Sequence, residues 1–235
     1  MATYVCADLH GHYEIYEKIK AMLKPGDTVY CLGDCGDRGP RSWETIKAVL
    51  RDPQFIYLKG NHEDMLVKAG EDFLVGDECW DYSSYQQCRS NGGLMTMKDW
   101  ENDRNREGWL IRLRKLPTVM AHKTDKHIFI LSHAGFTPCV ENNELIVPEE
   151  EELLWSREHF WDKWDDKMDK SIIVVHGHTP NHYLADELRV KWEEGSGALW
   201  YANRHKVCID CGGFFSNEWV VLNLDTLEEI RLTCE

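Results

Sequence analysis

Five short apolar runs recur along the chain, and each of them ends in a polar loop that contains glycine. The runs are rich in β-branched and other aliphatic residues, and they cover positions 3–7, 28–32, 55–58, 127–131 and 172–175. Apolar runs of this length that are bounded by glycine are typical of buried strands. The pattern therefore predicts five strands, each followed by a loop that carries polar side chains.

Two amphipathic segments, 13–23 and 41–50, lie between the first three predicted strands and are expected to be helices. The polar residues Asp8, Asp34 and Asn61 follow these strands at intervals close to the ~30 residues of one βαβ unit. Successive βαβ units build a parallel sheet whose strands all end at one edge, and open α/β sheets bind ligands at that edge. We therefore expect the polar loops after the five strands to converge in space.

The side chains in these loops are aspartate, histidine and asparagine, the oxygen and imidazole donors that suit manganese, iron or zinc. Taken singly, each has an ordinary explanation: Asp34 fits a turn, Asn61 fits a helix cap, and a histidine after a strand is usually a loop residue. The repetition of the pattern at five strand ends favours a shared role. Six such donors exceed the needs of one tetrahedral zinc and suit two adjacent metals bridged by a carboxylate, as in phosphoester hydrolysis.

The remainder of the chain indicates one domain with an insertion. Positions 70–117 contain no strand-like run and several helical pieces, so we expect a helical insertion there. Three later apolar runs are interpreted as antiparallel strands of a second sheet, at 198–201, 206–209 and 219–224. Since no linker rich in proline or serine interrupts the chain, residues 1–235 are expected to form a single domain.

Composition narrows the possible partners. The chain has 27 Lys and Arg against 41 Asp and Glu, a formal net charge of −14. This balance argues against nucleic-acid binding and against anionic membranes, both of which depend on clustered basic residues. Bound divalent metals would still allow an anionic substrate in one pocket. No apolar stretch approaches the ~18 residues of a membrane span, and the N-terminus lacks the features of a signal peptide.

The nine cysteines are scattered without a disulfide framework, and Cys6, Cys31 and Cys208 fall inside apolar runs. We interpret them as buried apolar side chains in a reducing compartment. Cys208 and Cys211 form a C-x-x-C pair, but a zinc site needs a second pair of ligands, and no comparable pair follows. We therefore expect a cytoplasmic protein, and we expect it to be a monomer.

The polar loops carry motifs in a fixed order. They are Asp8-Leu9-His10-Gly11, Gly33-Asp34-x-x-Asp37-Arg38-Gly39, Gly60-Asn61-His62-Glu63, His133-Ala134-Gly135 and Gly177-His178-Thr179-Pro180. In these motifs the chain resembles the calcineurin-like metallophosphoesterases, and among them the phosphoprotein phosphatases of the bacteriophage lambda type. Trp155-Ser156-Arg157 resembles the second arginine motif of that type, and Asn91-Gly92-Gly93 and Ile209-Asp210-Cys211-Gly212 resemble further segments more weakly. Five ordered motifs make the resemblance specific.

The resemblance implies an α/β fold, the αββα sandwich, in which two mixed β-sheets pack face to face and helices flank them. It also implies two divalent metal ions as cofactors, with manganese favoured and iron or zinc as alternatives. Asp8, His10 and Asp34 would hold the first metal. Asp34 would bridge to a second metal held by Asn61, His133 and His178.

The same resemblance assigns the remaining site residues. His62 would be the general acid beside the leaving oxygen, oriented by Asp37, because a histidine next to a carboxylate can supply a proton near neutral pH. Arg38 and Arg157 would bind the substrate phosphate together with Asn61, since the planar fork of arginine matches two phosphate oxygens.

The implied activity is metal-dependent hydrolysis of phosphate monoesters, and the leading substrate is phosphorylated serine or threonine in a protein. Symmetrical dinucleoside polyphosphate hydrolases look similar in the same motifs, so a small phosphoester of that kind is an alternative substrate. A pseudophosphatase that only captures phosphoproteins would have lost a metal ligand or His62, and the sequence retains all of them. Three departures from the family are Ala7 in place of a glycine, Cys35-Gly36 in place of an apolar pair, and the loop 211–214, which lacks the tyrosine of eukaryotic relatives.

Overall fold

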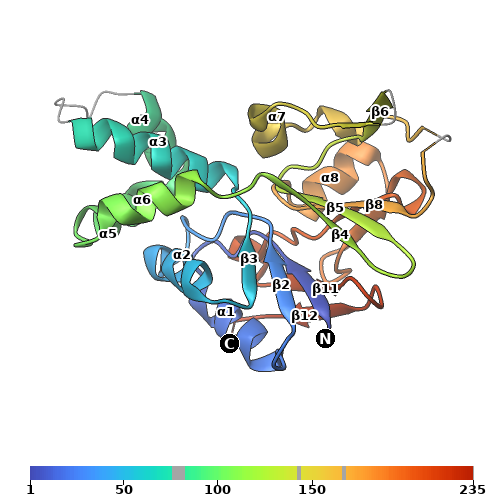
Figure 1. Cartoon of the computed structure of the whole chain (residues 1–235), viewed down its shortest axis with the longest axis horizontal. Helices are drawn as coiled ribbons and strands as arrows, with labels where there is room; N and C mark the ends of the chain where they lie inside the picture. The colour runs from blue at the N-terminus through green and yellow to red at the C-terminus, as the bar shows by residue number, and fades with distance from the viewer. Residues whose placement is uncertain (76–82, 142–143, 166–167, 235) are drawn as a thin grey trace.

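The computed structural model describes residues 1–75, 83–141, 144–165 and 168–234, and these residues form two mixed sheets of five strands each (Figure 1). The first sheet contains, in spatial order, β12 (Glu229–Leu232), β11 (Trp219–Asn223), β1 (Thr3–Cys6), β2 (Thr28–Cys31) and β3 (Phe55–Tyr57). The second contains β4 (Val119–Lys123), β5 (Ile128–Ser132), β8 (Ile172–His176), β10 (Lys206–Cys208) and β9 (Leu199–Tyr201). A separate hairpin pairs β6 (Cys139–Glu141) with β7 (Glu144–Ile146).

In the first sheet β1, β2 and β3 run parallel, as the two βαβ units predict. Their connections are the helices α1 (Tyr13–Met22) and α2 (Ser42–Arg51), each of which buries one apolar face. Ile19 of α1 and Ile46 of α2 belong to the same buried cluster as Val29 of the sheet. The amphipathic pattern of these segments thus places both helices on the outer face of the first sheet.

The two sheets pack face to face through an apolar layer contributed by both of them. This layer includes Val5, Tyr30, Leu32, Leu58, Phe129, Leu131, Val175, Val207, Val220 and Leu222. The outer face of the second sheet is covered by α7 (Glu150–Trp155) and α8 (Asn181–Leu188), whose residues Leu153 and Leu184 pack against the strands. The αββα sandwich is therefore confirmed.

The segment between β3 and β4 is mainly helical and extends to one side of the sandwich (Figure 1). Its elements are α3 (Asn61–Val75), α4 (Ser83–Cys88), a π-helical turn (Arg89–Gly93), α5 (Leu94–Glu101) and α6 (Arg106–Arg114). The first helix begins at Asn61, directly after the third strand, rather than near position 70. Trp100 and Leu113 are fully buried among these helices, which gives the segment an apolar core continuous with that of α1 and α2.

Two predictions about the strands are wrong. The runs 127–131 and 172–175 correspond to β5 and β8 of the second sheet, so the five polar loops do not share one sheet edge. The run 219–224 corresponds to β11, which pairs with β1 in the first sheet, whereas the runs 198–201 and 206–209 correspond to β9 and β10, an antiparallel pair in the second sheet as predicted. Residues 219–222 are all buried because β11 is an interior strand, and local patterning does not reveal which strand lies beside it.

The strand β4 was not predicted, because its residues are only half-buried or exposed and it forms the edge of the second sheet. The eight cysteines of the described residues are free, and Cys6, Cys31 and Cys208 are buried as predicted. Within the ranges that the structure describes, no helix is long and apolar enough to cross a membrane.

Candidate metal and phosphate site

The loops that follow the strands contain an unusual concentration of left-handed backbone. Among the described residues, six of the twelve non-glycine residues with positive φ belong to the predicted site: Asp8, His10, Asp34, Asp37, Arg38 and His178. Such conformations cost free energy in residues other than glycine and persist where the surrounding structure enforces them, most often at functional sites. The fold therefore holds these side chains in orientations that relaxed loops would not adopt.

Asp34 is the central residue of the site. One of its carboxylate oxygens, Oδ2, lies 3.8 Å from His10 Nε2 and 3.7 Å from His62 Nε2. The other, Oδ1, lies 3.4 Å from His133 Nε2. Two compact groups of potential metal ligands result, His10 with Asp34 and His62 on one side and Asp34 with His133 and His178 on the other. Asp34 thus has the geometry of a carboxylate that bridges two cations.

The donor atoms fit metal ions. His10 Nδ1 donates to the carbonyl of Gly36 at 3.0 Å, and His133 Nδ1 donates to the carbonyl of Leu32 at 2.9 Å. In each ring the lone pair is therefore on Nε2, the atom that faces Asp34, as is usual for metal-ligating histidines. His133 Nε2 also lies 2.8 Å from Asn61 Oδ1, which is another acceptor. Hydrogen-bond acceptors repel one another when no proton lies between them. A cation bound between them would remove this repulsion.

The protonation of these groups agrees with metal binding. Burial lowers the pKa of His10, His133 and His178 below the usual value of histidine, so the rings are neutral, as ligands must be. Burial would raise the pKa of Asp34, but the neighbouring histidines, His133 first among them, outweigh it and lower that pKa. Asp34 is therefore ionised.

Asp8 lies beside these two groups rather than within them. Both of its carboxylate oxygens accept the backbone N–H of His178, at 3.2 and 3.1 Å. Burial, together with the charges of Asp210 and Asp34, raises the pKa of Asp8 well above its usual range. Asp8, Asp34 and Asp210 are all buried, and a divalent cation nearby would favour the ionised form of their carboxyl groups.

A hydrogen-bonded chain of three residues leads to His62. Thr96 Oγ1 donates to Asp37 Oδ1, and Asp37 Oδ2 accepts from His62 Nδ1 at 2.6 Å. Burial opposes the charged form of His62, but Asp34 and the hydrogen bond to Asp37 outweigh it and raise its pKa above the usual value. His62 is therefore suited to holding a proton near neutral pH, with Nε2 as the atom that faces the site.

The two predicted phosphate-binding arginines line one cavity of about 860 Å³, together with His178. Arg38 Nη1 donates to His10 Nε2 at 2.7 Å, and Arg38 Nη2 lies 2.9 Å from His62 Nε2. Arg157 Nε donates to Thr179 Oγ1 at 3.0 Å. Both guanidinium groups thus border the space beside the predicted metal ligands, where a bound phosphate would accept from them.

Two residues with supporting roles were not assigned from the sequence. Glu63 is buried and accepts four hydrogen bonds, from the backbone N–H groups of Asp34, Cys35 and Gly60 and from the hydroxyl of Tyr57. It thereby ties the loop after β2 to the loop after β3. Glu63 was visible as the last residue of the motif Gly60-Asn61-His62-Glu63, but its contacts across loops were not.

The second unassigned residue is Thr96, on α5 of the helical segment. The same segment contacts the site through Gly92, whose carbonyl accepts the backbone N–H of Arg38 at 3.3 Å. A Cβ at position 93 would clash with Cys88 Sγ and lie 2.9 Å from the Cys88 carbonyl oxygen and 3.1 Å from Asp37 Oδ2, so Gly93 allows the helical segment to pack closely there. The motif Asn91-Gly92-Gly93 therefore belongs to the wall of the site. The sequence around it does not indicate that Arg38 would be its hydrogen-bond partner.

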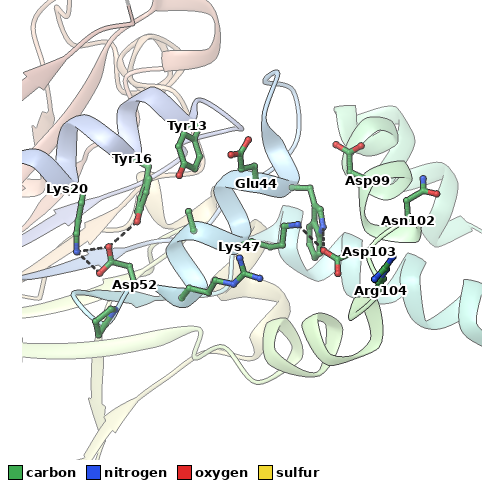
Figure 2. Close-up of a pocket in the computed structure, with 14 residues that line it drawn as sticks. Tyr13, Tyr16, Lys20, Glu44, Lys47, Asp52, Asp99, Asn102, Asp103 and Arg104 are labelled. Carbon is green, nitrogen blue, oxygen red and sulfur yellow. Dashed lines mark hydrogen bonds and ion pairs between the residues drawn. The ribbon is translucent and has the colours of Figure 1, made fainter.

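A second large cavity, of about 1050 Å³, lies between α1, α2 and α5 (Figure 2). Four of its charged groups form two ion pairs, Lys20 with Asp52 and Lys47 with Asp103. None of the predicted site residues lines it. We therefore place the chemistry at the cavity that Arg38 and Arg157 line.

Comparison with known proteins agrees with this geometry. Residues 1–209 match the family described as calcineurin-like phosphoesterase. Serine/threonine-protein phosphatase 2 of Escherichia coli (strain K12) is 28% identical over 163 residues, which cover 65% of this chain and 66% of that protein. The symmetrical bis(5′-nucleosyl)-tetraphosphatase of Actinobacillus pleuropneumoniae serotype 3 (strain JL03) is 27% identical over 195 residues, 79% of this chain and 62% of that protein. The chain thus matches somewhat less than two thirds of the length of these relatives.

Solved structures show the same fold. A putative diadenosine tetraphosphatase superposes with a TM-score of 0.62 and 15% identity over 99% of this chain and 93% of that one. A protein serine/threonine phosphatase from Saccharomyces cerevisiae superposes with a TM-score of 0.59 and 14% identity over 100% of this chain and 80% of that one. At sequence identities of 15% and 14%, this similarity shows a shared fold and not a shared activity.

Proposed function

Because this chain belongs to the calcineurin-like phosphoesterases, a family that uses divalent metals, we propose that it hydrolyses phosphate monoesters with two cations. The observation that carries the proposal is Asp34, whose two carboxylate oxygens face two separate histidine groups. Asp8 and His10 would hold one cation with Asp34, and Asn61, His133 and His178 would hold the other. We favour manganese, with iron or zinc as the alternatives that the same ligands accept.

Two bound cations would supply positive charge for the phosphate and lower the pKa of a water molecule. The chain's own residues supply the remaining functions. Arg38 and Arg157 hold the phosphate oxygens and orient the ester. His62, oriented by Asp37, holds a proton on Nε2. As the oxygen of water bonds to phosphorus and the ester P–O bond breaks, this proton passes to the leaving oxygen, and the proton that the water releases to solvent is balanced when His62 takes one up again.

The first candidate substrate is phosphorylated serine or threonine in a protein, which is supported by the relative named as a serine/threonine-protein phosphatase. The alternative to monoester hydrolysis is cleavage of a phosphoanhydride bond in a symmetrical dinucleoside polyphosphate, which is supported by the relatives named as bis(5′-nucleosyl)-tetraphosphatases. The second candidate also has a structural observation in its favour, the aromatic lining of the phosphate cavity. A pseudophosphatase is disfavoured because His62 and all six proposed ligands are present. The cytoplasmic location, the monomeric state and the single-domain organisation stay predictions.

The test is a substrate panel in the presence of Mn²⁺, with phosphoserine peptide, para-nitrophenyl phosphate and diadenosine tetraphosphate. His62→Asn should keep both metals and lower kcat by about 10²–10⁴. The loss should be larger on phosphoserine peptide, because its alkoxide leaving group needs the proton more than nitrophenolate does. No metal-dependent hydrolysis of any of the three would refute the proposed activity. An equal loss on both monoesters, with metal content intact, would remove the general-acid role of His62.

A further inference from the structure

Three side chains that carry metal-binding atoms meet outside the proposed catalytic site: His12, Glu14 and Cys234. Sγ of Cys234 lies 3.6 Å from Nδ1 of His12 and 4.0 Å from Oε2 of Glu14. One ligand atom from each of the three lies within 4.8 Å of the others. Among the described residues, the other two groups of this kind both contain Asp34 and belong to the catalytic site. This cluster is therefore a separate one.

The distances in this cluster fit a zinc ion. Zinc binds thiolate sulfur at about 2.3 Å and imidazole nitrogen at about 2.0–2.1 Å, and in tetrahedral geometry these two ligand atoms lie about 3.5–3.6 Å apart. The 3.6 Å between Sγ of Cys234 and Nδ1 of His12 agrees with that value. The 4.0 Å between Sγ and the carboxylate oxygen is slightly wide, but Glu14 is exposed and its side chain is free to rotate toward the other two.

The fold holds two of the three side chains in place. The backbone N–H of Cys234 donates to Asn217 Oδ1, and Asn217 Nδ2 donates to the carbonyl of Cys234, both at 2.9 Å. The segment after β12 also lies beside α1, where Lys18 Nζ donates to the carbonyl before Cys234 at 2.7 Å (Figure 1). His12 directly precedes α1, and its ring lies 4.7 Å from the ring of Trp219. The sulfur and nitrogen ligands are thus positioned before an ion binds.

We propose that His12, Glu14 and Cys234 bind a zinc ion that links the segment after β12 to the start of α1. The inference goes beyond the proposed function and does not depend on it. Sulfur together with imidazole favours zinc, whereas the proposed catalytic ligands contain no sulfur and also accept manganese. When zinc binds, the thiol proton of Cys234 passes to solvent. The resulting thiolate and the carboxylate of Glu14 balance the two charges of the ion, and water takes the fourth tetrahedral position.

The cluster is connected to the loop that carries the first proposed catalytic ligands. Trp219, whose ring packs against His12, donates from Nε1 to the carbonyl of Asp8 at 3.1 Å. Asp8 and His12 belong to the same loop after β1. Because zinc would hold His12 against the segment after β12, we expect a structural role in which the ion supports this loop from outside the catalytic site.

The experiment is a titration of the whole chain with Co²⁺, with the thiols reduced and excess Mn²⁺ present to occupy the catalytic site. Cobalt bound to a thiolate gives a charge-transfer absorption band in the near ultraviolet. None of the proposed catalytic ligands is a cysteine, so this band reports a different site. We expect the band to appear in the wild type and to disappear when Zn²⁺ is added, because zinc replaces cobalt at sulfur and imidazole ligands.

Four variants decide which residues hold the ion. Cys234→Ser should abolish the band, and Cys139→Ser, which removes the exposed cysteine of β6, is the matched control and should leave it unchanged. His12→Ala and Glu14→Gln should each weaken cobalt binding by about tenfold or more, since even the partners of metal ligands change affinity by about 10–100-fold.

The outcomes do not depend on whether the chain hydrolyses phosphoesters. No band in the wild type, or a band that survives Cys234→Ser, overturns the site. Unchanged affinity in both His12→Ala and Glu14→Gln also overturns it, because the band would then come from Cys234 without the cluster. If His12→Ala does not fold, Glu14→Gln decides alone, since this change lies at the surface.

Discussion

Glu63→Gln tests whether one buried carboxylate holds the two metal-binding loops together. Glu63 Oε1 accepts from the hydroxyl of Tyr57 at 2.6 Å and from the backbone N–H of Cys35 at 3.0 Å. Its Oε2 accepts from the backbone N–H groups of Asp34 and Gly60, at 2.8 and 2.9 Å. Glutamine has nearly the same shape, but its amide nitrogen cannot accept a hydrogen bond. Two of the four donors would therefore lose their partner inside the protein.

The expected loss in the free energy of unfolding follows from these contacts. A hydrogen bond to a charged group contributes about 1.5–3 kcal/mol, and two lost bonds would cost about 3–6 kcal/mol. Burial and the charge of Asp34 raise the pKa of Glu63 to about 7, so the carboxyl is only partly ionised at neutral pH. We therefore expect the free energy of unfolding to fall by about 3 kcal/mol, toward the lower end of that range.

The assay is urea unfolding at pH 7 with a chelator present, so that metal binding does not contribute to the measured stability. Glu71→Gln is the matched control, since Glu71 lies on the same helix and pairs with Arg114 at the surface at 3.2 Å. Surface pairs contribute about 0–1 kcal/mol, so this variant should stay close to the wild type. If Glu63→Gln is no more destabilising than Glu71→Gln, the four hydrogen bonds do not hold the loops as argued.

Three further changes test other parts of the structure. Arg157→Ala should keep both metals and lower kcat/KM by about ten- to a hundredfold with weaker inhibition by inorganic phosphate; unchanged phosphate inhibition would leave Arg157 only as a partner of Thr179. Thr96→Val should keep both metals and lower kcat by about two- to tenfold, since Asp37 loses one hydrogen-bond donor, and an unchanged kcat would show that Thr96 does not contribute to catalysis. Burial lowers the pKa of Lys206 to about 8 from 10.5, so the unfolded chain binds more protons between these values and this group adds stability as pH rises through them. Relative to Lys206→Met, the wild type should gain about 3 kcal/mol from pH 8 to 10.5 in urea unfolding, whereas a difference that does not change with pH would contradict the assignment.

The strands and helices that depend only on local sequence patterns were the easiest to predict. The strands β1, β2 and β3 and the helices between them follow from apolar runs, glycine boundaries and amphipathic spacing, all of which are local. The motif residues Asp34, Asn61 and His133 could likewise be listed from their places after strands. What local patterning could not give is which strands lie together, because pairing depends on contacts between distant segments. The interior position of β11 and the edge strand β4 are of this kind.

The supporting residues of the site escaped prediction for the same reason. Thr96 is an ordinary threonine in a helix until the fold brings it to Asp37, 59 residues earlier in the chain. The exposed aromatic side chains that line the phosphate cavity come from three parts of the chain: Trp161 follows α7, Tyr183 lies on α8, and Phe214 and Phe215 lie on the short helix α9 (Gly213–Ser216). A single sequence marks these side chains as apolar, and apolar side chains are usually buried. Only their exposure in the folded chain distinguishes a binding surface from core.

The proposed metal ligands come from both sheets, so the site forms only when the two sheets pack together. Asp34 follows a strand of the first sheet, whereas His133 and His178 follow strands of the second. The backbone of His178 is bonded to Asp8, 170 residues away, and His133 is bonded to the carbonyl of Leu32. Neither sheet alone can bring these donors together, so the apolar layer between the sheets sets the distances between them. That layer, although it contains none of the proposed ligands, therefore determines the geometry on which the two-cation arrangement depends.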